Sequence, residues 1–138
     1  MARILGLDPG TKRCGVAITD SEQRMAFPRE ALTVGPDLMK QLALLIEEEF
    51  VAGIVVGLPH ALSGAETAST RFATEFFEEI CREFPDLPAI QYDERLTTKQ
   101  ASHQLSEAGH KMEKQRNLVD SAAAVILLES YLEGLPRD

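Results

Sequence analysis

Acidic residues stand at the ends of apolar segments in three places along the chain. They are Asp8, the pair Asp93 and Glu94, and Asp120. Carboxylates that converge in a fold repel one another unless a cation compensates, and their hard oxygens favour Mg²⁺ or Mn²⁺. A pair of such ions can activate a water and stabilise the leaving oxygen when a phosphodiester is hydrolysed. The acidic positions therefore predict a divalent metal site suited to phosphodiester chemistry.

Each of these carboxylates also has an ordinary structural interpretation. Asp8 precedes Pro-Gly and is typical of a turn, and Asp93 or Glu94 can pair with a neighbouring cation at a solvated strand end. Asp120 suits the first turn of a helix, where the helix dipole favours an acid. Because side chains alternate along a strand, only one of Asp93 and Glu94 is expected to point towards Asp8.

The elements that must position these residues follow from hydrophobic periodicity and turn signals. The predicted strands are residues 4–7, 15–19, 26–34, 53–58 and 89–92. The first predicted helix spans residues 36–50. A second follows a capping box of Ser63 and Glu66 and continues to residue 80. A third runs from Thr97 or Thr98 to Gly109, and the last spans residues 118–132. The first two strands form a hairpin, and Pro28 indicates that the third strand is an edge strand or contains a bulge.

Strands that alternate with helices after an opening meander predict an α/β fold with a mixed five-stranded sheet and helices on both faces. The first strand is expected to be central, with its end facing the crevice where α/β proteins bind ligands. No repeat, low-complexity tract or linker divides the sequence, so residues 1–138 are interpreted as a single domain.

Composition narrows the class of protein. The chain has 138 residues with 14 basic and 22 acidic side chains, a net charge of −8 that counts against non-specific nucleic-acid binding but allows a local basic patch. No segment has the length and apolarity of a membrane span, and the start lacks the pattern of a signal peptide. The two cysteines, Cys14 and Cys81, fit no metal-binding pattern, and the expected compartment is the reducing cytoplasm.

Four segments together resemble the YqgF (RuvX) family, which is described both as Holliday junction resolvases and as pre-16S rRNA nucleases with an RNase H-like fold. They are residues 4–17 (ILGLDPGTKRCGVA), 56–59 (VGLP), 93–98 (DERLTT) and 119–124 (VDSAAA). They occur in the family's order and span nearly the whole chain. Between residues 59 and 64 this chain has His60-Ala61-Leu62-Ser63, where the family usually has a polar loop with Asn. His60 is a candidate for proton transfer or phosphate binding, and an ordinary loop residue is the alternative.

The resemblance implies a metal-dependent endonuclease. Its acidic triad is carried over to Asp8, Glu94 and Asp120, as catalytic residues and as ligands of Mg²⁺ or Mn²⁺, with Asp93 as the neighbouring alternative. The implied nucleic-acid-binding residues are Lys12, Arg13, Arg71, Arg95, Lys111, Lys114 and Arg116. For any one of these cations, a solvated surface position is the alternative.

Several functions remain open from the sequence. The resemblance implies structured nucleic acid as the partner: the 5′ region of pre-16S rRNA, or four-way DNA junctions as the alternative. A resolvase needs paired sites on a homodimer, and the chain is expected to be a monomer or a homodimer. A non-catalytic ribosome assembly factor is a further alternative. The opening hairpin also resembles that of actin-like ATPases and sugar kinases, but those enzymes close a nucleotide between two such domains.

Overall fold

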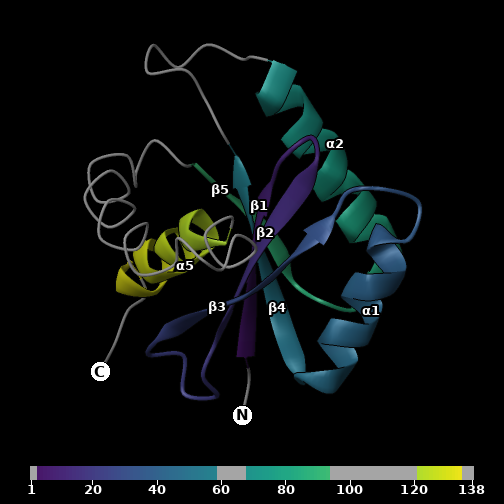
Figure 1. Cartoon of the computed structure of the whole chain (residues 1–138). Helices are drawn as coiled ribbons and strands as arrows, with labels where there is room; N and C mark the ends of the chain where they lie inside the picture. Colours follow the sequence, from purple (N-terminus) through teal and green to yellow (C-terminus); the bar gives the residue numbers. More distant parts are fainter. Residues whose placement is uncertain (1–2, 59–67, 94–120, 135–138) are drawn as a thin grey trace.

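The computed structural model describes residues 3–58, 68–93 and 121–134, and these form a five-stranded mixed sheet with helices on both faces (Figure 1). The strands are β1 (Arg3–Pro9), β2 (Arg13–Thr19), β3 (Ala26–Thr33), β4 (Val51–Leu58) and β5 (Ala89–Asp93), in the order β3-β2-β1-β4-β5. The helices are α1 (Leu38–Glu48), α2 (Ala68–Glu83) and α5 (Ala122–Glu133). The predicted α/β architecture and the central first strand are confirmed.

Strand direction brings three chain segments to one edge of the sheet. β1 pairs antiparallel with β2, whereas β4 runs parallel to both β1 and β5. The carboxyl ends of β1, β4 and β5 therefore lie at the same edge, the position where open α/β sheets bind ligands. In the hairpin between β1 and β2, the Gly10 N–H donates to the Arg13 carbonyl at 3.0 Å. A Cβ on Gly10 would lie 2.6 Å from that oxygen, so this turn requires glycine.

The larger hydrophobic core lies under α1 and α2. Its twelve buried residues among the described ones are Leu5, Leu7, Cys14, Val16, Ile18, Leu38, Leu42, Val51, Ile54, Val56, Phe76 and Ile80. Both helices are amphipathic: α1 buries Leu38 and Leu42, while its other face meets solvent. Such a stripe of apolar residues at helical spacing is what the sequence pattern predicted.

The opposite face is covered by α5, which lies very close to the sheet. Ala17, Val55, Ala124, Leu127 and Leu128 form the buried cluster there. A Cβ on Gly6 of β1 would lie only 2.4 Å from the Leu128 Cγ, so glycine is required at this position. At its carboxyl-terminal end, α5 is tied to β5 because the Tyr92 and Ser130 hydroxyl oxygens are 3.0 Å apart.

Element boundaries differ from the sequence prediction at several points. α1 begins at Leu38 instead of Pro36, and β4 begins two residues earlier than predicted, at Val51. β3 is an edge strand that contains Pro28, and its register with β2 shifts between Cys14 and Val16, so both features expected from the proline are present. The capping box at Ser63 and Glu66, the helix predicted from Thr97 or Thr98 to Gly109, and residues 118–120 of the last helix lie outside the described residues.

Within the described residues, no helix has the length and apolar composition needed to cross a membrane. Both cysteine thiols are free, Cys14 buried under α1 and α2 and Cys81 exposed on α2.

Candidate functional site

Asp8 occupies the carboxyl end of the central strand and is half-buried. Leu5 and Leu7 belong to the core under α1 and α2, whereas Ile4 packs against the α5 cluster. Since side chains alternate along a strand, Asp8 lies on the same face as Ile4 and Gly6, the face that α5 covers. The structure thus places this predicted ligand at the ligand-binding edge of the sheet.

The buried thiol near Asp8 is chemically inert. Burial raises the pKa of Cys14 far above its ordinary value, and the negative charge of Asp8 raises it further, although a hydrogen bond with the Asp8 backbone acts in the opposite direction. A thiol rather than a thiolate is therefore present at neutral pH, and thiolate is the nucleophilic form. Cys14 is also fully buried in the core under α1 and α2, on the face opposite to Asp8, so its position does not suit a nucleophile at the site.

The start of α5 is attached to the sheet beside Asp8. Ser121, which is fully buried, accepts a hydrogen bond from the Val16 N–H at 3.0 Å and donates one to the Arg29 carbonyl at 2.6 Å. Val16 follows Gly15, the cross-strand partner of Asp8. The amino-terminal end of α5 and the end of β1 are therefore neighbours in space. Asp120 itself lies outside the described residues.

The end of β5 provides the third acidic position. Asp93 pairs in register with Leu58 of β4, and β4 separates β5 from β1, so Asp93 and Asp8 are two strands apart at the same edge, about 10 Å. Tyr92 packs against the α5 cluster and Ala89 against the other core. Alternation therefore gives Asp93 the face of Ala89, opposite to that of Asp8. Glu94 and Arg95 lie outside the described residues.

No three His, Cys, Asp or Glu side chains of the described segments are grouped in a way that could hold a metal ion. Two of the three predicted ligands, Glu94 and Asp120, are not among those segments. The metal site and its triad accordingly stay predictions, and what the structure adds is the position of Asp8 and of the elements that lead to the other two.

The predicted basic residues fall into three groups. Lys12 and Arg13 are exposed in and after the hairpin turn next to Asp8. Arg71 is exposed near the start of α2, a helix that packs on the face of the sheet opposite to Asp8. Arg95, Lys111, Lys114, Arg116 and the loop residue His60 lie outside the described residues.

Sequence reasoning missed the structural role of Ser121. The signal was present, because a serine directly before a long apolar helix is typical of an N-cap. In the structure Ser121 occupies the N-cap position but makes no side-chain cap bond, and its hydroxyl reaches the strands instead. Gln91 was missed as well: it is a polar residue of β5 whose buried amide nitrogen has no hydrogen-bond partner among the described residues.

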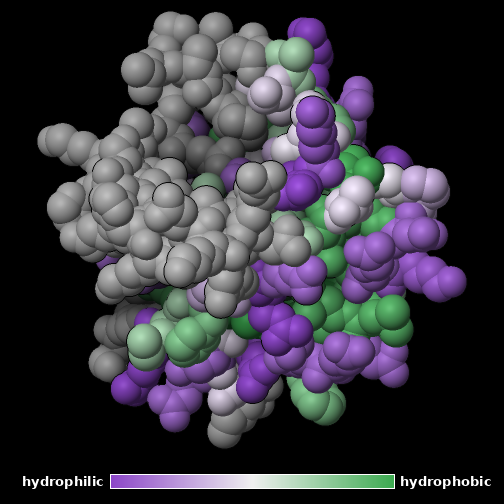
Figure 2. All heavy atoms as spheres, in the orientation of Figure 1, coloured by the Kyte–Doolittle hydropathy of each residue, from purple (hydrophilic) through white to green (hydrophobic). Residues whose placement is uncertain are grey.

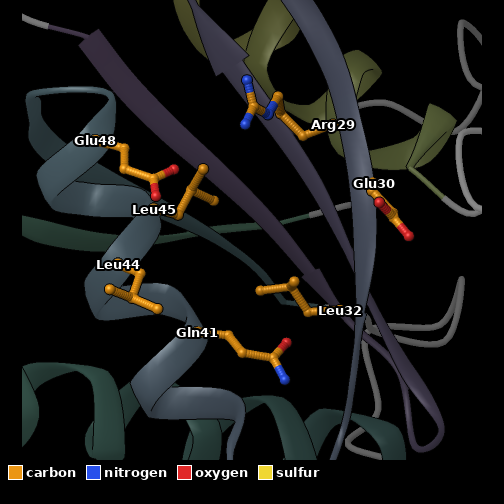
Figure 3. A pocket seen from close by; sticks show the side chains of 7 residues that line it. All are labelled: Arg29, Glu30, Leu32, Gln41, Leu44, Leu45 and Glu48. Atoms are coloured by element: carbon orange, nitrogen blue, oxygen red, sulfur yellow. The ribbon is translucent and has the colours of Figure 1, made fainter.

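Two hollows formed by described residues lie away from Asp8. A groove of about 280 Å³ runs between α1 and the edge strand β3, with Leu44 and Leu45 facing Leu32 across it (Figure 3). A second hollow of about 500 Å³ lies between the start of α1 and α2. Figure 2 shows hydrophobic surface at α1 bordered by hydrophilic residues. Both hollows belong to the face opposite to Asp8. No predicted site residue lines either of them, although Phe72, which lines the second, is the sequence neighbour of Arg71.

Sequence comparisons identify related proteins over nearly the whole chain. A family model described as RuvX, Holliday junction resolvase, matches residues 2–134. A protein of Corynebacterium jeikeium named "Putative pre-16S rRNA nuclease" is 41% identical over 137 residues, which cover 98% of this chain and 88% of that protein. A protein of the same name from Oleidesulfovibrio alaskensis is 39% identical over 138 residues, covering 99% of this chain and 94% of that protein.

Solved structures resemble the fold at low sequence identity. Thermus thermophilus RuvC in complex with a Holliday junction substrate matches with a TM-score of 0.62 and 12% identity, covering 96% of each chain. The Fowlpox virus resolvase bound to Holliday junction DNA matches with a TM-score of 0.63 and 15% identity, covering 98% of this chain and 99% of that one. The RNase H-like fold implied by the sequence resemblance is thereby confirmed.

Proposed function

Because the chain belongs to the RuvX family, we propose that it is a metal-dependent endonuclease that processes the 5′ end of pre-16S rRNA. The observation that carries the proposal is the position of Asp8. It ends the central strand, on the face covered by α5, and lies beside the anchored start of that helix. An exposed turn with two cations adjoins it.

The catalytic triad is proposed to be Asp8, Glu94 and Asp120. Asp93 lies on the face of the sheet opposite to Asp8. Because side chains alternate along a strand, this supports Glu94 rather than Asp93 as the second member of the triad. For Asp120, support comes from Ser121, whose hydroxyl is bonded to the strands at Val16 and Arg29. Adjacent Cα atoms are about 3.8 Å apart, so the residue before Ser121 starts from this anchored point.

The donor set suits Mg²⁺ or Mn²⁺, since carboxylate oxygens are the ligands these hard cations prefer. Such a cation, when bound, would activate a water for attack on the phosphodiester and stabilise charge on the leaving oxygen. Asp8 would hold the cation from a rigid central strand, which limits its movement during the reaction.

Nucleic-acid binding is assigned to the basic residues around this edge. Lys12 and Arg13 are exposed next to Asp8 and are proposed to contact backbone phosphates. Arg71, Arg95, Lys111, Lys114 and Arg116 remain candidates for further phosphate contacts. A local cluster of this kind would offset the net charge of −8 where the backbone binds.

The substrate is proposed to be structured RNA in the cytoplasm, acted on by a monomer or a homodimer. The names of the relatives support pre-16S rRNA, whereas the family description and the two structural neighbours support branched DNA as a second candidate. Junction resolution would require a homodimer with paired sites. A non-catalytic ribosome assembly factor is the third candidate.

A paired cleavage assay tests the proposal. A 5′-extended 16S precursor RNA and a four-way DNA junction are each incubated with the protein and with Mn²⁺ or Mg²⁺. Asp8→Asn is expected to abolish cleavage. Asp20→Asn is the matched control, because Asp20 bonds its own turn at the other end of the sheet. Residual activity of Asp8→Asn above about a tenth of wild type would contradict a ligand role, since that loss is only about 1.4 kcal/mol of barrier.

Each pattern of cleavage favours one function. Cleavage of the RNA alone supports a maturation nuclease, and symmetric nicking of the junction alone assigns the protein to junction resolution. Failure to cut either substrate would favour the assembly factor.

A further inference from the structure

We propose that Ser121 is a positioning residue of the nuclease site, whose hydroxyl fixes the start of α5 against the strands beside Asp8. The inference rests on the proposed function, because the carboxylate it would position is that of Asp120, the residue that precedes it. Ser121 would touch neither substrate nor metal.

The hydroxyl of Ser121 both accepts a hydrogen bond from the sheet and donates one to it. It accepts from the Val16 N–H of β2 at 3.0 Å and donates to the Arg29 carbonyl of β3 at 2.6 Å. Ser121 is 0% exposed, so water does not replace either bond. A hydroxyl held by a donor and an acceptor on two different strands has little freedom to move.

These two strand groups face each other at an irregular point of the sheet. Val16 and Arg29 are cross-strand partners immediately after the register shift that begins at Cys14. The Ser121 hydroxyl thus lies between the Val16 N–H and the Arg29 carbonyl, and it bridges these two groups at the irregular point of the β2–β3 ladder. Bulges of this kind commonly occur beside active sites, where they redirect side chains. Here the extra residue belongs to β3, and Gly15, the cross-strand partner of Asp8, lies opposite it on β2.

The same contact determines where α5 begins. The helix is fixed at its other end by the contact between Tyr92 and Ser130, and in its middle Leu128 packs against Gly6. Ser121 adds a fixed point on β2 and β3, next to Gly15, the cross-strand partner of Asp8. Since the preceding Cα is only about 3.8 Å from that of Ser121, loss of the hydroxyl would free the Asp120 carboxylate to shift relative to Asp8.

A control variant that removes a similar buried hydroxyl elsewhere in the sheet separates a positioning role of Ser121 from a purely structural one. Thr19 is also buried, 1% exposed, and its hydroxyl accepts from the Ile4 N–H at 2.8 Å. It lies at the opposite end of β2 from the bulge. Thr19→Val therefore removes a comparable buried hydroxyl from the same sheet, but far from Asp8.

The test is a direct titration with Mn²⁺ of wild type, Ser121→Ala and Thr19→Val, at a temperature well below all three melting midpoints. Both variants are expected to melt at lower temperature than wild type. Ser121→Ala is expected to raise the Kd for Mn²⁺ by about tenfold, the range found when groups that orient metal ligands are removed. Thr19→Val is expected to leave that Kd unchanged. Ser121→Thr, which keeps a hydroxyl, should restore most of the affinity and serves if Ser121→Ala does not fold.

The outcomes separate this inference from the proposed function. If wild type binds Mn²⁺ and the Kd of Ser121→Ala exceeds that of Thr19→Val by about fivefold or more, the positioning role is supported. A smaller ratio overturns it and leaves the nuclease proposal intact, as does loss of affinity in a folded Ser121→Thr. If wild type does not bind Mn²⁺ at millimolar concentration, the metal site fails and the inference fails with it.

Discussion

Among the described residues, twelve buried side chains form the core between the sheet and the two amphipathic helices α1 and α2, whereas five form the cluster between the sheet and α5. The first face has the large side chains of an ordinary core. The second has Gly6, Ala17 and Ala124, small residues that allow α5 to lie close to the strands. Asp8 lies on this second face. The comparison indicates that one face mainly stabilises the fold, while the other holds a helix in a fixed place beside a carboxylate.

A matched pair of core truncations tests this difference most strongly. Leu42 of α1 and Leu127 of α5 are both buried, at 0% and 1% exposure. Each Leu→Ala change should lower the free energy of unfolding by about 2–5 kcal/mol, because it removes apolar contacts and leaves a cavity. Only Leu127→Ala should also weaken Mn²⁺ binding, since it loosens the helix that starts beside Asp8. The measurements are urea unfolding and a Mn²⁺ titration of the folded protein.

If Leu42→Ala weakens Mn²⁺ binding as much as Leu127→Ala does, the two faces are not separable in function. The Mn²⁺ titration is made at a temperature well below the melting midpoints of both variants, so that a loss of affinity does not merely reflect unfolding.

The close contact between Gly6 and Leu128 gives the next largest effect. Gly6→Ala should destabilise the protein by about 1–3 kcal/mol, the usual cost of overpacking, because its Cβ would lie 2.4 Å from the Leu128 Cγ. Gly53→Ala on β4 is the matched control: there the tightest contact of the new Cβ would be the flexible end of Ile4 at 3.1 Å, and the Pro88 carbonyl at 3.7 Å is an ordinary contact. It should be neutral or slightly stabilising, because alanine in a strand loses less backbone entropy than glycine.

A double-mutant cycle locates the cause of that effect. Leu128→Ala removes the atoms that a Gly6→Ala side chain would meet, so the double variant should be less destabilised than the sum of the two single changes by about 1 kcal/mol. Additive unfolding free energies would show that the close approach of α5 is not what requires glycine at position 6.

The sequence predicted most of the fold because its signals were local. The apolar strands, the Pro-Gly turn after Asp8 and the apolar periodicity of α1 and α2 each depend on neighbouring residues. Pro28 correctly indicated an edge strand, since a proline cannot donate to a central ladder. The starting points of α1 and β4 were less accurate because helix and strand ends depend on tertiary packing.

The site was only partly predictable for the opposite reason. Asp8 was found because it ends an apolar strand, and alternation predicted that Asp93 and Glu94 would differ in direction. The role of Ser121 depends on strands 105 and 92 residues away along the chain, and no local pattern encodes such a contact. Gly6 was part of a recognised motif, but its packing against Leu128 required the structure.

The smallest effect is expected for Asp20, an aspartate at the other end of the sheet from Asp8. Its carboxylate accepts hydrogen bonds from the Arg24 N–H at 2.8 Å and the Met25 N–H at 3.1 Å, and these bonds lower its pKa below the ordinary value. A lowered folded-state pKa means that this contribution to stability is present above the unfolded pKa of about 3.9 and is lost as the pH falls through the folded value. Asp20→Asn, which cannot ionise, should therefore melt slightly below wild type at pH 6, and the difference should shrink towards pH 2.

The same variant should bind Mn²⁺ and cleave substrate like wild type, because the Asp20 carboxylate is already satisfied by its own turn. Melting curves between pH 2 and 6 and a Mn²⁺ titration provide the comparison with Asp8→Asn. Equal loss of Mn²⁺ binding in the two variants would mean that the metal effect follows from the net charge of the protein. Loss in Asp8→Asn alone would assign it to the carboxyl end of β1, on the sheet face that α5 covers.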